Sequence, residues 1–330
     1  MPRVDSDPGM ATASDAAGSD WQPGRIAVVG SGAVGLYYGA CLAHSGVEVH
    51  FLMRSDYGHA VGHGIAIDSV RGDFKIRPAH CHSKASDIGP CDLVIVAAKA
   101  TANAAVPDLV APLVRSGTVI VTLQNGLGNE EWLAQHFGGS AIMGGTCFVC
   151  LNRVGPAHVA HYDHGLIELG EFGRPAGPRA QRIAGALRAA GVPCQLTDDL
   201  ALTRWKKLVW NVPFNGLAIA EHGATVADIL SDPRLLARAR ALMSEIIGAA
   251  HRLGLSIPEN FADEMVARSL TMGPYRPSSL LDFEAGRDVE VEAIWGEPLR
   301  RGGAVGIPMP GLDALYSQLK RLCRASKVIR

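Results

Sequence analysis

The stretch Arg25-Ile26-Ala27-Val28-Val29-Gly30-Ser31-Gly32-Ala33-Val34-Gly35 decides the fold expected for the first half of this 330-residue chain. Its apolar, β-branched start is typical of a buried parallel strand, and an apolar segment ending at His44 follows the glycines. Strand, Gly-x-Gly-x-x-Gly turn and helix in this order favour a Rossmann dinucleotide-binding unit. Gly30 permits the tight turn, Gly32 lets the backbone approach a pyrophosphate, and Gly35 lets the helix pack on the strand. We therefore expect Gly30–Gly35 to hold a dinucleotide at a helix N-terminus, where free N–H groups favour an anion.

The end of the next predicted strand indicates which dinucleotide is bound. Val47–Met53 is predicted as this strand, and Arg54 follows it directly. Proteins that use NAD place an acidic residue here for the ribose 2′-hydroxyl, but the one acid of Val47–Ser55 is Glu48, at the opposite end. A guanidinium suits a 2′-phosphate, so Arg54 favours NADP(H). A solvated arginine at a strand end is the alternative.

Two further predicted strands end in polar side chains. The segments Asp92–Lys99 and Gly117–Gly126 are apolar and β-branched until their ends, where Lys99 and Asn125 stand. In open α/β sheets, ligands bind outside the carboxyl ends of the strands. We therefore expect Lys99 and Asn125 to lie at the nicotinamide ribose, and Asn125 to face the substrate as well. A lysine in this position can also be an ordinary surface residue.

Composition excludes several kinds of partner. The formal net charge is −1 and no long Lys/Arg run occurs, so we expect no nucleic acid partner. No apolar run approaches the roughly 18 residues that cross a bilayer, so we expect no membrane partner. The 7 cysteines lack the spacing of a disulfide framework, which fits a reducing cytosol and a cytoplasmic protein.

Cysteines and histidines also invite a metal interpretation, which their spacing disfavours. Cys147 and Cys150 would need a second pair nearby to form a structural zinc site. His158, His161 and His164 lie in a predicted strand or hairpin, where His161 would point away from the other two. We expect no metal, and we expect the cysteines to be buried apolar residues.

Three segments are expected along the chain, since single cores rarely grow beyond roughly 250–300 residues. Residues 1–22 are rich in Ala, Ser, Asp and Gly and lack the apolar centre of a signal peptide, so they are predicted to be a disordered tail. Residues 23–198 are predicted to form the Rossmann domain. Long helical patterns begin after Thr197, which predicts a helical substrate domain over residues 199–330.

The segment Leu200–Ala220 is predicted as the first helix of the second domain. Asp198 or Asp199 is the expected N-cap. Pro213 should kink this helix, because proline lacks an N–H group and crowds the preceding turn.

One face of this predicted helix carries polar residues in an apolar setting. Lys207, Asn211 and Asn215 are spaced four apart and share this face, and Lys206 lies about 100° away. Polar side chains among tryptophans and leucines are costly to bury unless they have partners. A bound polar substrate would supply such a partner.

Ser279 and Glu290 are candidates for the two ends of a substrate site. On one straight helix they would lie roughly 16 Å apart, too far for one small acid to reach both. Gly286 and Asp288 offer a helix stop and a new N-cap, which would let the chain fold back. Glu290 would then lie in the first turn of the second helix, where the helix dipole favours its carboxylate.

Taken together, these motifs resemble the ketopantoate reductases (2-dehydropantoate 2-reductases) across nearly all of Arg25–Leu319. The matching pieces include Gln124-Asn125-Gly126, Trp205-x-Lys207-Leu-x-x-Asn211 and Ser279-x-x-Asp282, besides the glycine turn, Arg54, Lys99 and Glu290. The resemblance implies an α/β fold: an N-terminal Rossmann domain and an all-helical C-terminal domain similar to that of 6-phosphogluconate dehydrogenase.

The resemblance also implies roles for individual residues. Lys207 would be the general acid, and Glu290 would hold the terminal hydroxyl of the substrate, so these two are the expected catalytic residues. Ser279 would bind the substrate carboxylate. Asn125, Asn211 and Asn215 would line the substrate pocket.

The expected reaction is reduction of a branched 2-oxo acid by NADPH, with 2-dehydropantoate to pantoate as the first candidate. The helix after Glu290 runs to Trp295-Gly296 where family members often have Asn-Gly, and Arg276 stands where some have asparagine. The alternatives are therefore an NADP-dependent oxidoreductase acting on another oxo acid or an imine, and a non-catalytic NADP-binding sensor. The sequence does not determine the oligomeric state, for which a homodimer is one option.

Overall fold

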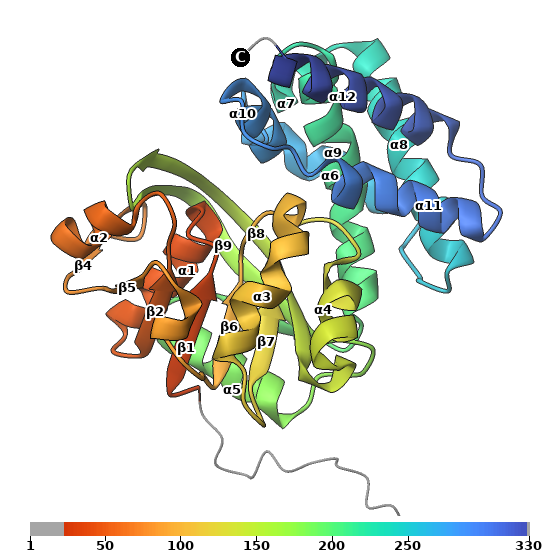
Figure 1. Cartoon of the computed structure of the whole chain (residues 1–330). Coiled ribbons are helices and arrows are strands. Elements are labelled where there is room, and N and C mark those ends of the chain that lie inside the picture. The colour runs from red at the N-terminus through yellow and green to blue at the C-terminus, as the bar shows by residue number, and fades with distance from the viewer. Residues whose placement is uncertain (1–22, 329–330) are drawn as a thin grey trace, which may run out of the picture.

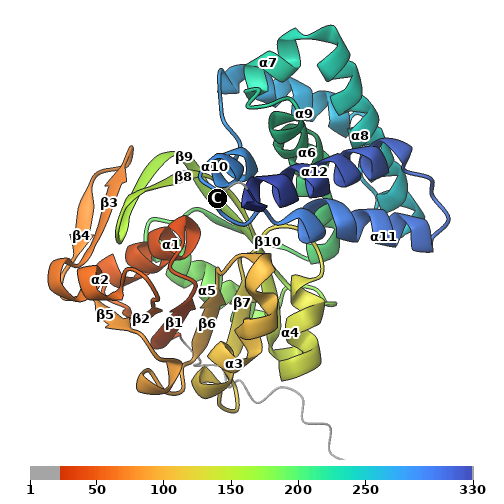
Figure 2. The ribbon, with the colours of Figure 1, turned by 45° about the horizontal axis from the view of Figure 1, so that its top comes forward.

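The computed structural model describes residues 23–328, and the tail predicted over residues 1–22 lies outside this range. Figures 1 and 2 show a sheet with helices on both faces and, at one end of it, a group of helices formed by the C-terminal part of the chain. Among the described residues, no helix is long and apolar enough to span a membrane.

Within residues 23–328, ten strands form one mixed sheet with the order β4-β3-β9-β8-β7-β6-β1-β2-β5, and β10 pairs with β9. The central strands β2, β1, β6, β7 and β8 run parallel, as the Rossmann prediction requires, whereas β8 and β9 form a long antiparallel pair. The strands are β1 (Arg25–Val29), β2 (Glu48–Leu52), β3 (Ile65–Ser69), β4 (Phe74–Ile76), β5 (His80–His82), β6 (Leu93–Val96), β7 (Val119–Thr122), β8 (Ile142–Gly155), β9 (His158–Glu171) and β10 (Cys194–Thr197).

Helices cover both faces of the sheet, which explains why β6 is apolar at every position and β1 at every position after Arg25. One face packs on α1 (Ala33–His44) and α5 (Pro178–Ala189), and the other on α3 (Val106–Val110) and α4 (Asn129–Phe137). The short helix α2 (Tyr57–His63) lies near the β2 and β5 edge.

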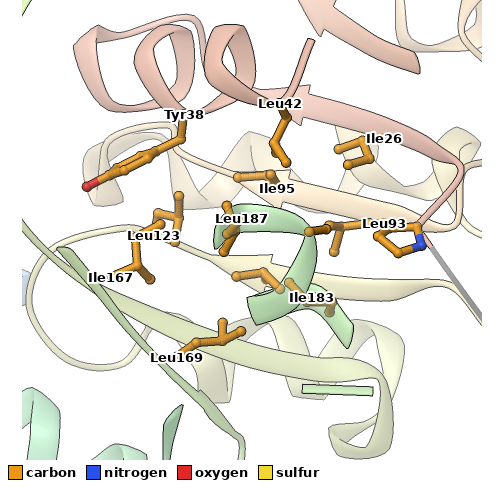
Figure 3. A pocket seen from close by; sticks show the side chains of 13 residues that line it. Ile26, Tyr38, Leu42, Leu93, Ile95, Leu123, Ile167, Leu169, Ile183 and Leu187 are labelled. Carbon is orange, nitrogen blue, oxygen red and sulfur yellow. The ribbon is translucent and has the colours of Figure 1, made fainter. Parts of the chain in front are cut away.

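Figure 3 shows an apolar hollow in the core between α1, α5 and the sheet. Tyr38 and Leu42 of α1, and Ile183 and Leu187 of α5, reach into it from opposite sides. Its lining is almost entirely aliphatic, so this hollow is a packing gap of the core and does not belong to the site described below.

The C-terminal part is helical, as predicted. Its elements are α6 (Leu200–Ala220), α7 (Val226–Ser231), α8 (Pro233–Arg252), α9 (Phe261–Ser269), α10 (Ser278–Glu284), a π-helical segment (Glu292–Gly296), α11 (Glu297–Ala304) and α12 (Pro310–Val328). Helix α6 lies at the centre of this part and also reaches down beside the sheet (Figure 1). Asp199 is its N-cap, because its Oδ1 accepts a hydrogen bond of 2.8 Å from the Leu202 N–H. The helix continues through Pro213, and the kink at that position stays a prediction.

The hydrophobic cores support the proposed domain boundary between residues 198 and 199. Two buried clusters lie on the two faces of the sheet and include nothing beyond Leu196, whereas a third combines the C-terminal helices with Leu127. The boundary falls between β10 and α6.

The surroundings of the cysteines, and of His161 in β9, are those of residues that pack within the fold. All seven cysteines are free of disulfides; the prediction that they are buried is right for four and wrong for the half-buried Cys81, Cys150 and Cys323. His161 is buried, and its Nδ1 lies 2.8 Å from Ser69 Oγ and 3.2 Å from the Tyr37 hydroxyl.

Candidate functional site

The Gly30–Gly35 turn connects β1 to α1, and two of its glycines are required by close packing. Gly30 has a φ of +106°, and a Cβ there would lie 2.2 Å from the Ala98 backbone nitrogen. A Cβ on Gly35 would lie 2.1 Å from the Gly30 carbonyl oxygen. Both separations are far below van der Waals contact, so this strand–turn–helix junction excludes any side chain at these positions.

The third glycine of the turn faces open space, which fits a pyrophosphate. Apart from Gly32 and its two chain neighbours, no heavy atom of the described residues lies within 4 Å of the position that a Gly32 Cβ would take. Gly32 is also the N-cap of α1, and no side chain caps this helix, so the N–H groups of its first turn, at Ala33 and Val34, are available to an anion. The Ser31 hydroxyl donates a hydrogen bond of 2.7 Å to the Leu52 carbonyl, which ties the turn to β2. The residues of the turn therefore suit the pyrophosphate of a dinucleotide.

Arg54 stands just beyond β2, close in sequence to the strand end that the Ser31 hydroxyl contacts. It is exposed and makes no ion pair or hydrogen bond with the described residues. The nearby acid Asp56 is buried, and its carboxylate accepts hydrogen bonds from Arg153 and, at 2.7 Å, from the Ala157 N–H. Burial is the largest influence on Asp56, but these donors outweigh it and lower the pKa of the carboxyl. The Asp56 carboxylate is therefore occupied by these donors. Arg54 remains as the exposed charged side chain just beyond the end of β2.

Lys207 lies on α6 and points to the carboxyl end of the parallel strands. Its Nζ donates to Asn125 Oδ1 at 2.8 Å and to the Cys147 carbonyl at 2.9 Å. The structure thus joins two residues that the sequence placed in different domains. Lys206 points elsewhere, with its Nζ 5.8 Å from the centre of the Phe261 ring.

The surroundings of Lys207 hold its pKa well below that of a free lysine. Burial is the main cause, and it lowers the pKa of the ammonium to about 8. The positive charge of Arg204 acts in the same direction, whereas the acidic groups of Cys147, Glu290 and Glu168 raise the pKa. A pKa near neutrality suits a group that must give up a proton during the reaction.

Asn211, Asn215 and Ser279 are buried beside one another in the helical domain. Asn215 Oδ1 accepts a hydrogen bond of 3.0 Å from the Ser279 backbone N–H. The Asn211 amide and the Ser279 hydroxyl have no hydrogen-bond partner within residues 23–328. Neither group is among the fully buried polar atoms without a partner in the described residues, so both still reach solvent and are accessible to a polar ligand.

Glu290 and Lys99 meet where the two domains touch. Glu290 Oε1 accepts a hydrogen bond of 2.8 Å from the Ala100 N–H, and burial raises the pKa of this carboxyl. The neighbouring Lys99 Nζ donates to the Asp288 carbonyl at 2.6 Å and pairs with Asp282 Oδ2 at 2.7 Å. The loop after α10 is therefore fastened to the end of β6.

The predicted helix start at Asp288 is wrong. Gly286 does end α10, with a φ of +65°, but helical structure resumes only at Val291, so Glu290 precedes the first turn instead of lying in it. The reason is the contact between domains: Lys99 and Ala100 bind the backbone and side chain of the Asp288–Glu290 segment and hold it outside the helix.

The two residues that depart from the family pattern have structural partners. Arg276 is exposed and forms an ion pair with Glu284. Trp295 is fully buried, and its Nε1 donates to the Val212 carbonyl at 2.9 Å. Neither of these partners is one of the groups that contact the Lys207 ammonium.

Three residues near Lys207 were missed by the sequence analysis: Arg204 and Glu130, which form a buried ion pair, and the partly buried Glu168 of β9. Burial raises the pKa of the Glu168 carboxyl. Arg204 lies three residues before Lys207 and thus on the same helix face, a spacing that could have signalled it. Glu130 and Glu168 lie on other elements, far from Lys207 in sequence, so no spacing in the sequence indicates that they lie near it.

Comparison with known families covers both domains. The model of the family "Ketopantoate reductase PanE/ApbA" matches residues 26–174, and the model of its C-terminal part matches residues 199–322.

Individual relatives match over nearly the full length. The 2-dehydropantoate 2-reductase of Nostoc sp. is 38% identical over 303 residues, covering 90% of this chain and 95% of that protein. The crystal structure of 2-dehydropantoate 2-reductase from Geobacter metallireducens has a TM-score of 0.88 at 44% identity, covering 90% and 99% of the two chains. D-mandelate dehydrogenase with NADH and anilino(oxo)acetate has a TM-score of 0.84 at 21% identity over 92% and 99%, which shows a shared fold alone. The chain therefore belongs to the ketopantoate reductase family, a family of dinucleotide-dependent oxidoreductases.

Proposed function

We propose that this protein reduces 2-dehydropantoate, a branched 2-oxo acid, to pantoate with NADPH. The observation that carries the proposal is the pair of Lys207 and Asn125, whose side chains meet at 2.8 Å beside the carboxyl ends of the parallel strands. The names of the Nostoc and Geobacter relatives support the choice of substrate.

The dinucleotide would be held by the Gly30–Gly35 turn at its pyrophosphate, and by Lys99 and Asn125 near the nicotinamide ribose. When bound, NADPH supplies the hydride for C2 of the oxo acid. Arg54 would pair with the 2′-phosphate, since its guanidinium is exposed and has no other partner within residues 23–328. This pairing is the basis for proposing NADP(H) over NAD(H).

Lys207 supplies the proton in this mechanism. With a pKa of about 8, roughly ten ammonium groups exist for each neutral amine at pH 7. The ammonium donates its proton to the carbonyl oxygen as negative charge develops there, and Asn125 orients that oxygen. Partial burial removes competing water and strengthens both interactions.

The helical domain would orient the substrate. Ser279 would donate its hydroxyl to the carboxylate, and Asn211 and Asn215 would line the pocket between this end and Lys207. Glu290 would accept a hydrogen bond from the terminal hydroxyl at the other end. Polar groups left unpaired by a wrong substrate would disfavour its binding.

The test of the proposal is NADPH oxidation by the purified protein with 2-dehydropantoate, measured beside several other 2-oxo acids and a cyclic imine. We expect the highest kcat/KM with 2-dehydropantoate. A higher kcat/KM with another 2-oxo acid would favour the second candidate, a related oxidoreductase, to which the departures at Arg276 and Trp295 point. NADPH binding with no turnover of any compound would favour a sensor.

Glu290 provides a separate test of how the substrate is oriented. Glu290→Ala should lower kcat/KM more for 2-dehydropantoate than for an analogue that lacks the terminal hydroxyl, by roughly 10-fold or more. Equal losses for both compounds would show that Glu290 serves another step.

We also propose a cytoplasmic location and a homodimer. The absence of disulfides among the seven cysteines supports the first. The second is supported by the ketopantoate reductase from Staphylococcus aureus, a dimeric protein that shares this fold. Sedimentation equilibrium of the purified protein would test the dimer.

A further inference from the structure

The ion pair of Arg204 and Glu130 joins the two domains next to the proposed site. Arg204 belongs to the first turns of α6 and Glu130 to the first turn of α4, and each residue is only 4% exposed. Arg204 Nε donates to Glu130 Oε1 at 2.8 Å, and the Nη2 group bonds the same oxygen. Burying an ion pair rarely increases stability by itself, because the loss of hydration offsets the attraction. Stability alone therefore does not account for this buried pair.

The guanidinium of Arg204 also donates hydrogen bonds to the backbone directly before Asn125. Nη1 donates to the Gln124 carbonyl at 2.8 Å, and Nη2 donates to the Thr122 carbonyl at 3.2 Å. Lys207, three residues along the same face of α6, donates to the side chain of Asn125 itself. Helix α6 is thus hydrogen-bonded to the end of β7 and the residues after it through two side chains one turn apart. One is Arg204, and the other is Lys207, the proposed general acid.

The neighbouring strand is shaped around this pair. Gly144 of β8 lies opposite Thr122 of β7, and a Cβ at Gly144 would lie 2.3 Å from Glu130 Oε1 and 3.1 Å from Arg204 Nη2. Gly144 therefore leaves the space that the carboxylate and guanidinium occupy. Glu130 also lies in the first turn of α4, where the helix dipole favours a carboxylate.

We propose that Arg204 and Glu130 are positioning residues, which hold Lys207 and Asn125 in register with the carbonyl oxygen of the substrate. The proposal rests on the function proposed above. Arg204 holds the backbone at residues 122 and 124, and Lys207 lies one turn further along the same helix. The distance between Arg204 and Lys207 along α6 therefore sets where the Lys207 ammonium meets the Asn125 amide. Misplacement by about 1 Å can lower a rate by roughly 100-fold.

The pair also controls the charge around Lys207. The groups that act on its ammonium are Arg204 on the same helix, Cys147 of β8, Glu168 of β9 and Glu290 of the interdomain loop. Glu130 contacts Lys207 only through Arg204, whose positive charge it balances. Removing Glu130 alone should therefore lower the pKa of Lys207 further.

Two variants separate position from charge. Glu130→Gln keeps the positive charge of Arg204 unbalanced, so we expect the alkaline limb of the kcat/KM profile to move to lower pH. The double variant Arg204→Met/Glu130→Gln removes both charges at similar volume, which buried pairs often tolerate. We expect it to fold, to bind NADPH within about twofold of the original Kd, and to lose roughly 10- to 100-fold in kcat with little change in KM.

The matched control is Glu131→Gln. Glu131 is the next residue of α4 and also forms an ion pair across the domains, with Arg301 at 2.8 Å, but within residues 23–328 no hydrogen bond or ion pair joins it to residues 122–125. It should leave both kcat and the pH profile unchanged. The pKa of Lys207 is measured independently in the cofactor-free protein, from the pH dependence of its acetylation followed by mass spectrometry, and should fall in Glu130→Gln only.

Wild-type kcat and an unshifted Lys207 pKa in the Arg204 and Glu130 variants would overturn the positioning role. This result differs from failure of the proposed function, in which the unaltered protein reduces no 2-oxo acid while the acetylation measurement still reports on the pair. A fall in NADPH affinity as large as the fall in kcat would also overturn it, because the pair would then serve the architecture of both domains.

Discussion

Lys207 is the residue on which the proposed chemistry depends. Lys207→Ala removes the proton donor, so kcat should fall by roughly 10²- to 10⁴-fold while the NADPH Kd hardly changes. In the unaltered protein, kcat/KM should decline as pH rises through about 8, because the ammonium is then lost. Steady-state kinetics over pH and NADPH titration measure both effects.

Lys206 is the internal control for this experiment. Its Nζ lies over the Phe261 ring and away from Asn125. Lys206→Ala should therefore remain active. An inactive Lys206→Ala beside an active Lys207→Ala would show that the assignment of the general acid is wrong.

Arg54 should determine the choice between the two nicotinamide dinucleotides. Its exposed guanidinium has no competing partner in the part of the chain that the structure describes. Arg54→Ala should raise the KM for NADPH by roughly 10-fold or more, through loss of a charge-assisted hydrogen bond, and should barely change the KM for NADH. Equal use of both dinucleotides by the unaltered protein would contradict the assignment.

At the scale of elements, histidines join the edge strand β5 to β2. His50 is buried; its Nε2 lies 2.7 Å from Glu48 Oε1 and its Nδ1 lies 2.9 Å from His82 Nε2. Burial is the first cause that lowers the pKa values of both His50 and His82 below 6.5. The unfolded chain therefore binds more protons than the native protein below pH 6.5, and the free energy of unfolding should fall as pH falls through this value.

His82→Gln tests this contact, because the glutamine amide keeps a donor near His50 but does not titrate. The free energy of unfolding, measured by urea denaturation from about pH 8 to about pH 5, should depend less on pH in this variant. The exposed His59, changed in the same way, should leave the slope as it is. An unchanged slope in His82→Gln would exclude this pair as a source of pH dependence.

At the scale of the whole molecule, the two domains are fastened by Lys99, which pairs with Asp282 and the Asp288 carbonyl. The same lysine is proposed to bind the cofactor, so the two roles compete. Asp282→Asn should weaken the competing contact and lower the NADPH Kd by up to about fivefold, as expected for a partly exposed ion pair. Calorimetric titration measures this change; a higher Kd would mean that Asp282 holds Lys99 in its binding position.

The sequence alone determined the elements that carry its local motifs, and it proposed most of the candidate site residues. The Gly30–Gly35 turn, the helix Leu200–Ala220 with its cap at Asp199, and the shared face of Lys207 and Asn211 follow from local rules. Backbone sterics, capping and helical periodicity act over a few residues, so they can be recognised without the fold.

Only the tertiary structure decided how these residues meet. Arg204 contacts Glu130 across 74 positions of the chain, and Lys99 contacts Asp288 across 189. The second contact also displaced the helix start expected at Asp288. Such hydrogen bonds depend on how the two domains pack, because their strength comes from burial and geometry that no local pattern of residues encodes.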